Sequence, residues 1–234
     1  MIAVIPARQG SKRAPGKNVA RIGNKTLVAL TIEQAIRSKC FDDVIVTSDS
    51  QEVIDIAGQY PVSIQNRQEK FATDSATVLD VLLSTGQECQ WIPETIVALL
   101  QVTAPLRTAE DIQNALDIFL RSDGRQAVVS VAETEYPIYL TMTIEKGALS
   151  PVYPEIYRRG LRKQDQDTTY RWNDAVMVDN YGNLSSQERP NLFGENPLPY
   201  VMPLERSVAI DYPFQLQTCQ AISLLSNQGS TEGF

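Results

Sequence analysis

Residues 2–18 read IAVIPARQGSKRAPGKN, and the rest of the chain is organised around them. The stretch opens with four apolar residues, Ile2 to Ile5, which is the length of a buried strand, and Pro6 marks its end. The loop that follows is rich in glycine, proline and basic side chains. The chain carries a net charge of −7, yet its first acidic residue is Glu33. A cationic loop after the first strand of an acidic protein is typical of a site for a small polyanion, most simply a triphosphate.

This loop differs from both familiar phosphate-binding loops. In a P-loop, G-x-x-x-x-G-K-[ST], four residues separate the glycines and a hydroxyl side chain follows the lysine. Here Gly10 and Gly16 are one residue too far apart, and Asn18 stands in place of the hydroxyl residue. The G-x-G-x-x-G pattern is also absent. The alternative is a basic surface loop, but the position after a strand favours an anion site.

Apolar runs and amphipathic segments then alternate along the chain. The runs at 44–49, 62–64, 96–100 and 127–132 predict strands, and the segments at 27–38, 51–58, 76–88 and 109–121 predict helices. Asp49 is a candidate N-cap for the helix at 51–58. This order predicts a mostly parallel sheet with helices on both faces.

The alternation breaks between residues 133 and 172. This segment is rich in aromatic residues, prolines and charges, and it predicts an inserted β-hairpin arm with a short helix or loop. Strands are predicted again at 175–178 and 200–203, with a turn at 181–183 between them and a closing helix at 212–225. We therefore expect a single domain over residues 1–234 that carries one insertion.

Composition excludes several classes of protein. Histidine is absent, which excludes histidine-dependent catalysis and histidine-ligated metals. The three cysteines are far apart and match neither a zinc site nor a disulfide framework. There is no run of eighteen apolar residues and no signal-peptide core, so we expect no membrane association and a cytoplasmic location. A sequence pI of about 4.8 argues against a nucleic-acid partner.

The motif I-P-A-R-x-G-S-K-x-x-P-x-K-N in the first loop resembles the opening of the CMP-sialic acid synthetases (acylneuraminate cytidylyltransferases). The resemblance implies a three-layer, Rossmann-like nucleotidyltransferase that activates a nonulosonic acid with CTP. It also implies that the loop wraps the nucleotide and contacts it through Arg8, Ser11, Lys12, Lys17 and Asn18. Arg8, Lys12 and Lys17 would offset charge on the triphosphate and the leaving pyrophosphate, so Arg8 and Lys17 are catalytic candidates.

Two further stretches resemble motifs of the same family. Residues 66–77 resemble R-P-x-x-x-A-x-D-x-[AS]-[ST], which makes Arg67 and Thr77 nucleotide-binding candidates. The alternative for this stretch is a helix entry with Thr73 or Asp74 as the N-cap. Residues 101–107 resemble Q-P-T-S-P-L-R, in which the glutamine touches the sugar. Gln101 follows a predicted strand, where ligands of parallel sheets gather; the alternative for the rest of this stretch is a stiff turn that Arg107 caps.

Residues 162–175 resemble R-Q-x-x-P-x-x-[FY]-x-x-N-G-A. The resemblance makes these residues candidates for binding the acidic sugar: Arg162, Lys163, Gln164, Tyr170 and Asn173. Asp174 replaces the family's glycine, which allows close approach of the backbone. The alternative is a solvated charged segment.

Residues 207–213 resemble S-x-D-I-D-[TS]-x, whose two aspartates hold Mg2+ in the family. Here Ala209 replaces the first, and Asp211 is the one metal ligand and catalytic carboxylate that remains. One carboxylate can suffice, since phosphate and water oxygens complete the coordination of Mg2+. Asp211 is also a candidate N-cap for the closing helix, and the two roles are compatible.

Together these motifs imply an enzyme that converts CTP and a nine-carbon 2-keto sugar acid into a CMP-sugar and pyrophosphate, with Mg2+ as cofactor. The inserted arm is expected to form a homodimer, as in the family. Two alternatives remain open. One is a cytidylyltransferase for another acceptor, such as a Kdo-like acid, and the other is a nucleotide-binding homologue that has lost turnover together with the first aspartate.

Overall fold

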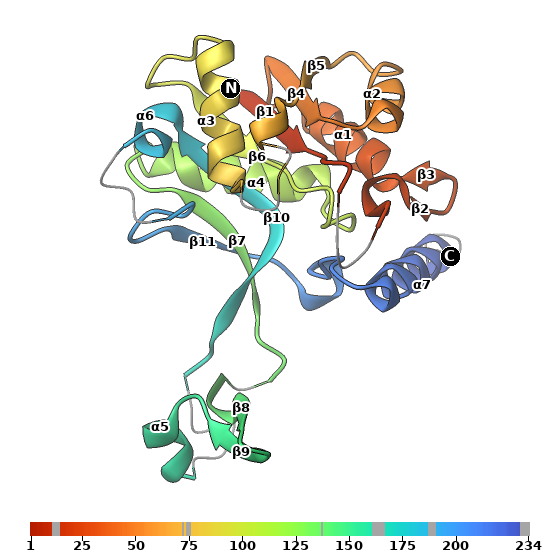
Figure 1. Ribbon diagram of the computed structural model, residues 1–234. Helices are drawn as coiled ribbons and strands as arrows, with labels where there is room; N and C mark the ends of the chain where they lie inside the picture. The colour runs from red at the N-terminus through yellow and green to blue at the C-terminus, as the bar shows by residue number, and fades with distance from the viewer. Residues whose placement is uncertain are drawn as a thin grey trace.

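The computed structural model describes residues 1–10, 15–71, 73, 76–136, 138–160, 167–186 and 191–229. Its centre is a seven-stranded sheet in the order β11-β7-β10-β6-β1-β4-β5 (Figure 1). The strands are β1 (Ile2–Pro6), β4 (Asp43–Ser48), β5 (Ser63–Asn66), β6 (Ile96–Leu99), β7 (Val128–Glu133), β10 (Tyr170–Asn180) and β11 (Leu198–Val201). The strand predicted at residues 2–5 is β1, and it lies between β6 and β4.

The sheet is mostly parallel, as the strand–helix alternation predicted. β1 pairs in parallel with β4 and β6, and β4 pairs in parallel with β5. β10 runs antiparallel between β6 and β7, and β11 is parallel to β7. The register of β10 against β7 shifts between Trp172 and Met177, which marks a bulge.

Helices cover both faces, so the predicted three layers are confirmed. Residues of α1 (Leu27–Ser38), α2 (Gln51–Ala57) and α4 (Ala109–Arg121) pack with one face, which includes Ala3 and Ile5 of β1. Residues of α3 (Val78–Glu88) and α6 (Tyr181–Leu184) pack with the other, which includes Val4. Successive side chains of a strand point to opposite faces, so β1 contributes to both cores.

Two predicted helix caps are wrong. Ser50, and not Asp49, caps α2, because its hydroxyl accepts the backbone N–H of Val53. Thr77, and not Thr73 or Asp74, caps α3 through a reciprocal pair of hydrogen bonds with Asp80. This capping box satisfies two N–H groups at once and starts α3 two residues later than residue 76. The turn predicted at 181–183 is the short helix α6.

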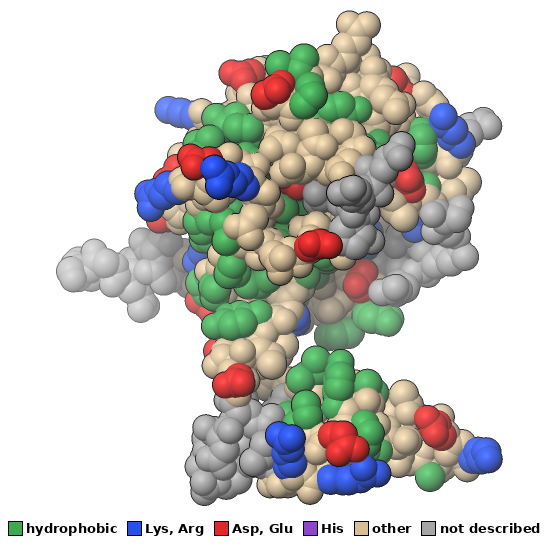
Figure 2. Space-filling model, turned by 90° about the vertical axis from the view of Figure 1, so that its left-hand side faces the viewer, with side chains coloured by type: hydrophobic (Ala, Val, Ile, Leu, Met, Phe, Trp, Pro, Cys, Tyr) green, Lys and Arg blue, Asp and Glu red, His purple; other side chains and the backbone are tan. Residues whose placement is uncertain are grey.

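The inserted arm lies between β7 and β10. It contains the 3-10 turn η3 (Ile138–Leu140), the hairpin β8 (Met142–Glu145) and β9 (Ala148–Pro151), and α5 (Pro154–Arg158). Figure 1 shows it projecting from the end of the extended β7–β10 pair, away from the helices that cover the sheet. The predicted hairpin and short helix are confirmed. Large apolar side chains of the arm are exposed, among them Tyr136, Ile144 and Leu149, and hydrophobic groups lie over the arm in Figure 2.

Short elements complete the fold. They are η1 (Lys17–Val19), β2 (Arg21–Ile22), β3 (Lys25–Thr26), η2 (Glu69–Phe71), η5 (Leu204–Arg206) and α7 (Pro213–Gly229). α7 lies beside β2, and Gln220 donates a hydrogen bond to the carbonyl of Arg21. Among the described helices, none is long and apolar enough to cross a membrane. Cys40, Cys89 and Cys219 are free thiols.

Candidate active site

Four parallel strands end at one edge of the sheet, and each is followed within two residues by a polar or charged residue. Arg8 follows β1, Asp49 follows β4, Arg67 follows β5 and Gln101 follows β6. Because the carboxyl ends of parallel strands meet at the same edge, four distant segments of sequence contribute to one site.

A cavity of about 200 Å3 opens at this edge. Sequence-predicted residues that line it are Arg8, Lys17, Asn18, Arg67, Thr77 and Gln101. The apolar part of the wall includes Phe71, Val81 and Val102. Two predicted nucleotide contacts, Ser11 and Lys12, lie outside the described residues. The structure thus brings together both nucleotide motifs and the glutamine of the predicted sugar motif.

The Arg67 side chain is largely enclosed in the cavity wall. Its guanidinium donates to the carbonyl of Thr47 at 3.1 Å, and its Nε has no hydrogen-bond partner in the described part of the chain. Burial lowers the pKa of Arg67, the charge of Asp49 partly offsets this effect, and the charge of Arg8 adds to it. An arginine remains protonated through such a shift. A half-buried cation in the cavity wall is suited to an anionic or carbonyl ligand.

The ends of the first loop are fixed by hydrogen bonds. Asn18, which is 9% exposed, donates from its amide to the carbonyl of Arg8 at 2.8 Å. The backbone N–H of Gln9 donates to Asp49 at 2.7 Å, and the Arg8 guanidinium donates to the carbonyl of Thr73 at 3.2 Å. Asp49 therefore anchors the loop instead of capping a helix.

Lys17 connects the loop to the segment that contains Asp211. Its ammonium group donates to the carbonyl of Ile210 at 3.1 Å and lies 3.6 Å from the Asp211 carboxylate. Asp211 lies two residues before α7. The N–H groups of Asp211 and Tyr212 both donate to the Gln215 side chain, which holds this segment against the first turn of α7. The cap predicted for Asp211 stays a prediction.

Asp174 lies beside this group, where the sequence motif has glycine. Its φ of +63° is in the left-handed region, which glycine adopts freely and aspartate tolerates. The Thr103 hydroxyl donates to its carboxylate at 3.4 Å. Burial and then the charge of Asp211 raise the pKa of Asp174, while Thr103 and Lys17 act in the opposite direction. Sequence reasoning did not identify Asp174 as a functional candidate.

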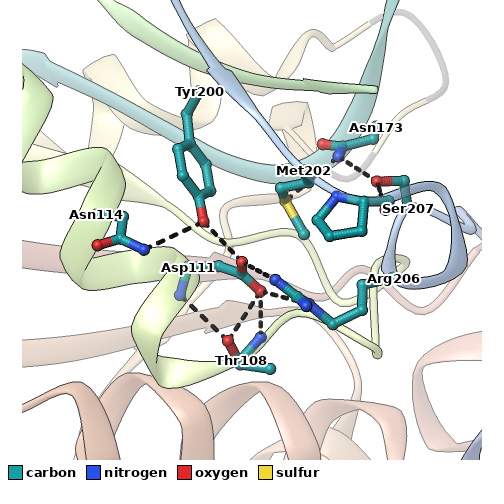
Figure 3. A network of polar contacts seen from close by, with 9 residues as sticks. Thr108, Asp111, Asn114, Asn173, Tyr200, Met202, Arg206 and Ser207 are labelled. Atoms are coloured by element: carbon teal, nitrogen blue, oxygen red, sulfur yellow. Dashed lines mark hydrogen bonds and ion pairs between the residues drawn. The ribbon is translucent and has the colours of Figure 1, made fainter. Parts of the chain in front are cut away.

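A buried polar network holds the segment between η5 and Asp211 (Figure 3). Asn173 is fully buried: its carbonyl oxygen accepts from Ser130 at 2.6 Å, and its amide donates to Ser207 at 2.9 Å and to the sulfur of Met202 at 3.3 Å. This geometry makes Asn173 a positioning residue, and its contact with a sugar stays a prediction.

The second part of this network is an ion pair at the start of α4. Asp111 is fully buried and accepts from Arg206 at 2.7 and 3.3 Å, from Tyr200 at 2.8 Å and from the Thr108 backbone at 2.8 Å (Figure 3). Burial by itself would raise the pKa of Asp111, but the hydrogen bonds, from Arg206 first, outweigh burial and lower it. From its sequence, Asp111 was only a first-turn acid of the helix at 109–121.

Arg107, also fully enclosed, ties the two loops of the site together. It donates to the carbonyls of Gln101 at 3.2 Å and Ala175 at 2.6 Å, so its capping role in the 101–107 turn is confirmed. Burial lowers its pKa to about 10, and the charge of Asp111 limits the fall.

The remaining predicted sugar contacts are only partly placed. Tyr170 is the first residue of β10 and is 51% exposed, near the base of the arm. Arg162, Lys163 and Gln164 lie outside the described residues.

Comparisons with known proteins agree with this geometry. A family model for cytidylyltransferases matches residues 2–140. A CMP-N,N'-diacetyllegionaminic acid synthase of Legionella pneumophila is 31% identical, over 97% of this chain and 98% of that protein. An N-acylneuraminate cytidylyltransferase of Escherichia coli is 31% identical over 90% of this chain, which spans about half (49%) of that protein's length.

The fold is also found among solved structures. A CMP:2-keto-3-deoxy-manno-octonic acid synthetase complexed with CTP superposes with a TM-score of 0.71 at 16% identity, over 96% of this chain and 98% of that chain. At this identity the likeness concerns the fold, which is that of a nucleotidyltransferase.

Proposed function

The chain belongs to the cytidylyltransferase family, and on that basis we propose that it transfers CMP from CTP to a nonulosonic acid and releases pyrophosphate. One observation carries the proposal. The cavity at the strand ends brings together Arg8, Lys17 and Arg67, in a chain similar over nearly its whole length to a CMP-legionaminic acid synthase. Three cations around one cavity suit the triphosphate of CTP, and the nearby carboxylates suit its metal counterion.

The chemistry is one substitution at phosphorus. The anomeric hydroxyl oxygen of the sugar attacks the α-phosphorus of CTP and forms the new P–O bond. The bond from the α-phosphorus to the bridging oxygen breaks, pyrophosphate leaves with the electron pair, and the hydroxyl proton passes to water. Arg8 and Lys17 would stabilise the negative charge that grows on the phosphates, because preorganised cations act most strongly where charge develops.

Mg2+ is the cofactor that we propose for this reaction. Asp211 would hold it, because carboxylate oxygens are ligands that Mg2+ prefers and Asp211 lies beside the cationic loop. When bound, the ion would offset charge on the phosphate oxygens. Lys17, which contacts both Asp211 and the carbonyl of Ile210, keeps that segment against the loop.

The proposed assembly is a homodimer formed through the arm. Tyr136, Ile144 and Leu149 of the arm are 83, 78 and 72% exposed, and burial against a second copy would remove this apolar surface from water. A cytoplasmic location and the absence of membrane and nucleic-acid partners remain parts of the proposal, supported by the acidic composition and the free thiols.

Pyrophosphate release tests the proposed function. The protein is incubated with CTP, Mg2+ and a panel of acids: sialic, legionaminic and pseudaminic acids, and Kdo as the eight-carbon alternative. We expect release with at least one nine-carbon acid, loss of release with EDTA, and much weaker release when UTP or ATP replaces CTP. Turnover with Kdo alone would favour the alternative acceptor. CTP binding without turnover on any acid would favour the inactive homologue.

A further inference from the structure

Glu88, the last residue of α3, connects that helix to the segment around Arg67. Its carboxylate accepts hydrogen bonds from the side-chain amides of Gln65 at 2.6 Å and Gln68 at 2.5 Å. The Ser84 hydroxyl, one turn earlier in α3, donates to the same carboxylate at 3.3 Å. Because Gln65 and Gln68 come before and after Arg67 in the sequence, one carboxylate holds the chain on both sides of a cavity arginine.

The sheet by itself holds this segment on one side only. β5 is the outermost strand of the described sheet and pairs with β4 alone. The strand ends at Asn66, and the N–H of Arg67 then donates to the carbonyl of Ser48 at 2.8 Å. An edge strand lacks the second neighbour that holds a central strand, so the bonds to Glu88 add a restraint that the sheet does not provide.

The Arg67 side chain depends on such a restraint for its direction. In the described part of the chain its guanidinium makes one hydrogen bond, to the carbonyl of Thr47 at 3.1 Å. Arg67 also borders a second, much smaller space of about 10 Å3, which Gln65, Gln68 and Glu88 line. That space has room for about one water molecule, so the guanidinium cannot withdraw into it from the main cavity.

The position of Glu88 in α3 argues against a role within the helix alone. A carboxylate in the last turn of a helix is disfavoured by the negative end of the helix dipole. Two of the three bonds to Glu88 come from outside the helix. The Gln65 amide is used at both ends, since its carbonyl oxygen accepts from the Thr85 hydroxyl at 2.7 Å while its nitrogen donates to Glu88.

We propose that Glu88 is a positioning residue for nucleotide binding. It acts through Gln65 and Gln68 on the backbone at Arg67, and so fixes the direction in which the Arg67 guanidinium meets the ligand. The inference rests on the proposed function for the identity of that ligand as CTP. Glu88 itself is exposed and does not line the main cavity.

The competing explanation is that Glu88 is an exposed carboxylate with incidental surface contacts. Glu88→Ala separates the two explanations, because it removes the acceptor that Gln65 and Gln68 share. Glu94, exposed in the loop between α3 and β6, supplies the matched control Glu94→Ala. Both variants remove one negative charge, which by itself would strengthen the binding of an anion. Weaker binding in Glu88→Ala would therefore run against the change in charge.

The first measurement is calorimetric titration with CTP. We expect Glu88→Ala to weaken CTP binding about threefold to tenfold, and Glu94→Ala to leave it unchanged. Arg67→Ala should weaken CTP binding about tenfold or more. Adding Glu88→Ala to Arg67→Ala should cause no further loss, because residues that act through one another are not additive. A general disturbance of the fold would instead add to the effect of Arg67→Ala.

The second measurement needs no nucleotide. Amide hydrogen exchange over residues 63–68 should be faster in Glu88→Ala than in the wild type or in Glu94→Ala, because the segment has lost its restraint. Glu88→Gln keeps one acceptor oxygen for two donors, so both its exchange and its CTP affinity should lie between those of Glu88→Ala and the wild type.

The inference is overturned if Glu88→Ala binds CTP as tightly as Glu94→Ala does, if its effect is the same with and without Arg67, or if exchange over residues 63–68 does not change. A failure of the proposed function looks different. It would appear as a wild type that binds no CTP or releases no pyrophosphate with any acceptor, while Glu88→Ala still accelerates exchange.

Discussion

The two sides of the site are built differently. On the side of β1, β4, β5 and β6, cationic and amide side chains come directly after the ends of parallel strands. On the β7–β10 side, the positions of the carboxylates depend on a bulge and on a buried polar network. Arg8, Arg67 and Gln101 are placed by the ordinary geometry of a parallel sheet. Asp174 and Asp211 are placed by Arg107, Asn173 and the Asp111–Arg206 pair. The first side therefore presents cations to the cavity, and the second holds its carboxylates in position.

The arm emerges from the second side, and removing it gives the largest expected effect. Thr134 donates its N–H to the carbonyl of Thr169 at 2.9 Å, so the ends of the arm are already close. Replacing residues 136–168 by an Asn-Gly turn should preserve the β7–β10 pair and give a monomer without activity. Sedimentation equilibrium and pyrophosphate release measure the two effects.

Point substitutions make the same test without a deletion. Ile144→Glu with Leu149→Glu should also produce a monomer, because charges cannot be buried in an apolar interface without a large cost. Ile92, 62% exposed and outside the arm, supplies the control Ile92→Glu, which should leave the dimer intact. A wild-type chain that stays monomeric at micromolar concentration would contradict the proposed dimer.

Asp211→Asn should have the next largest effect. Loss of the carboxylate that would hold Mg2+ removes several kcal/mol of charge stabilisation in the transition state. This corresponds to a fall of roughly a hundredfold or more in kcat. The fold should not change, since asparagine caps helices about as well as aspartate does. Steady-state kinetics should show the loss while the thermal midpoint stays constant. Full activity of this variant would contradict the metal assignment.

Arg8→Ala and Lys17→Ala separate the two sides of the site. Each should weaken CTP about tenfold or more and CMP much less, because a charge-assisted hydrogen bond is worth about 1.5–3 kcal/mol. Lys17 also contacts Ile210 and Asp211, so Lys17→Ala should lower kcat in addition, whereas Arg8→Ala should act mainly on binding. Calorimetric titration with both nucleotides tests this; equal losses for CTP and CMP would mean that the loop does not hold the triphosphate.

Arg206→Met should destabilise the second side by about 1.5–3 kcal/mol, toward the lower end because Arg206 is 35% exposed. The variant leaves the buried Asp111 carboxylate without its cationic partner. Arg121→Met, at an exposed arginine 4.0 Å from Asp117, is the matched control and should cost less than about 0.5 kcal/mol. Urea unfolding measures both, and equal costs would contradict a special role for Arg206.

The same pair predicts a pH dependence, with the smallest expected effect. The folded-state pKa of Asp111 is lowered, so its ionised form stabilises the fold above the ordinary aspartate pKa of about 3.9, and this stabilisation is lost as pH falls through the lower folded value. The free energy of unfolding of Asp111→Asn should therefore differ from that of the wild type by a constant amount between pH 5 and 7. The difference should shrink below about pH 4.

Sequence by itself determined the order of strands and helices, the inserted hairpin, the cationic loop and the family motifs. These features depend on neighbouring residues: an apolar run predicts a strand, and a parallel strand places the next side chains at the sheet edge whatever the distant sequence is. Even so, the caps of α2 and α3 were misassigned, since adjacent hydroxyl and carboxylate residues compete for the same N–H groups.

Tertiary structure alone decided where the carboxylates Asp174 and Asp111 lie and which partners they have. Asp174 lies where the register of β10 shifts between Trp172 and Met177, and it accepts a hydrogen bond from Thr103 of the cavity wall. A one-residue change of register would turn its side chain to the other face. Asp111 and Arg206 lie on α4 and η5, and no local pattern distinguishes them from exposed charges. Their partnership arises because burying a carboxylate requires a partner, and only the packing of distant segments supplies that partner.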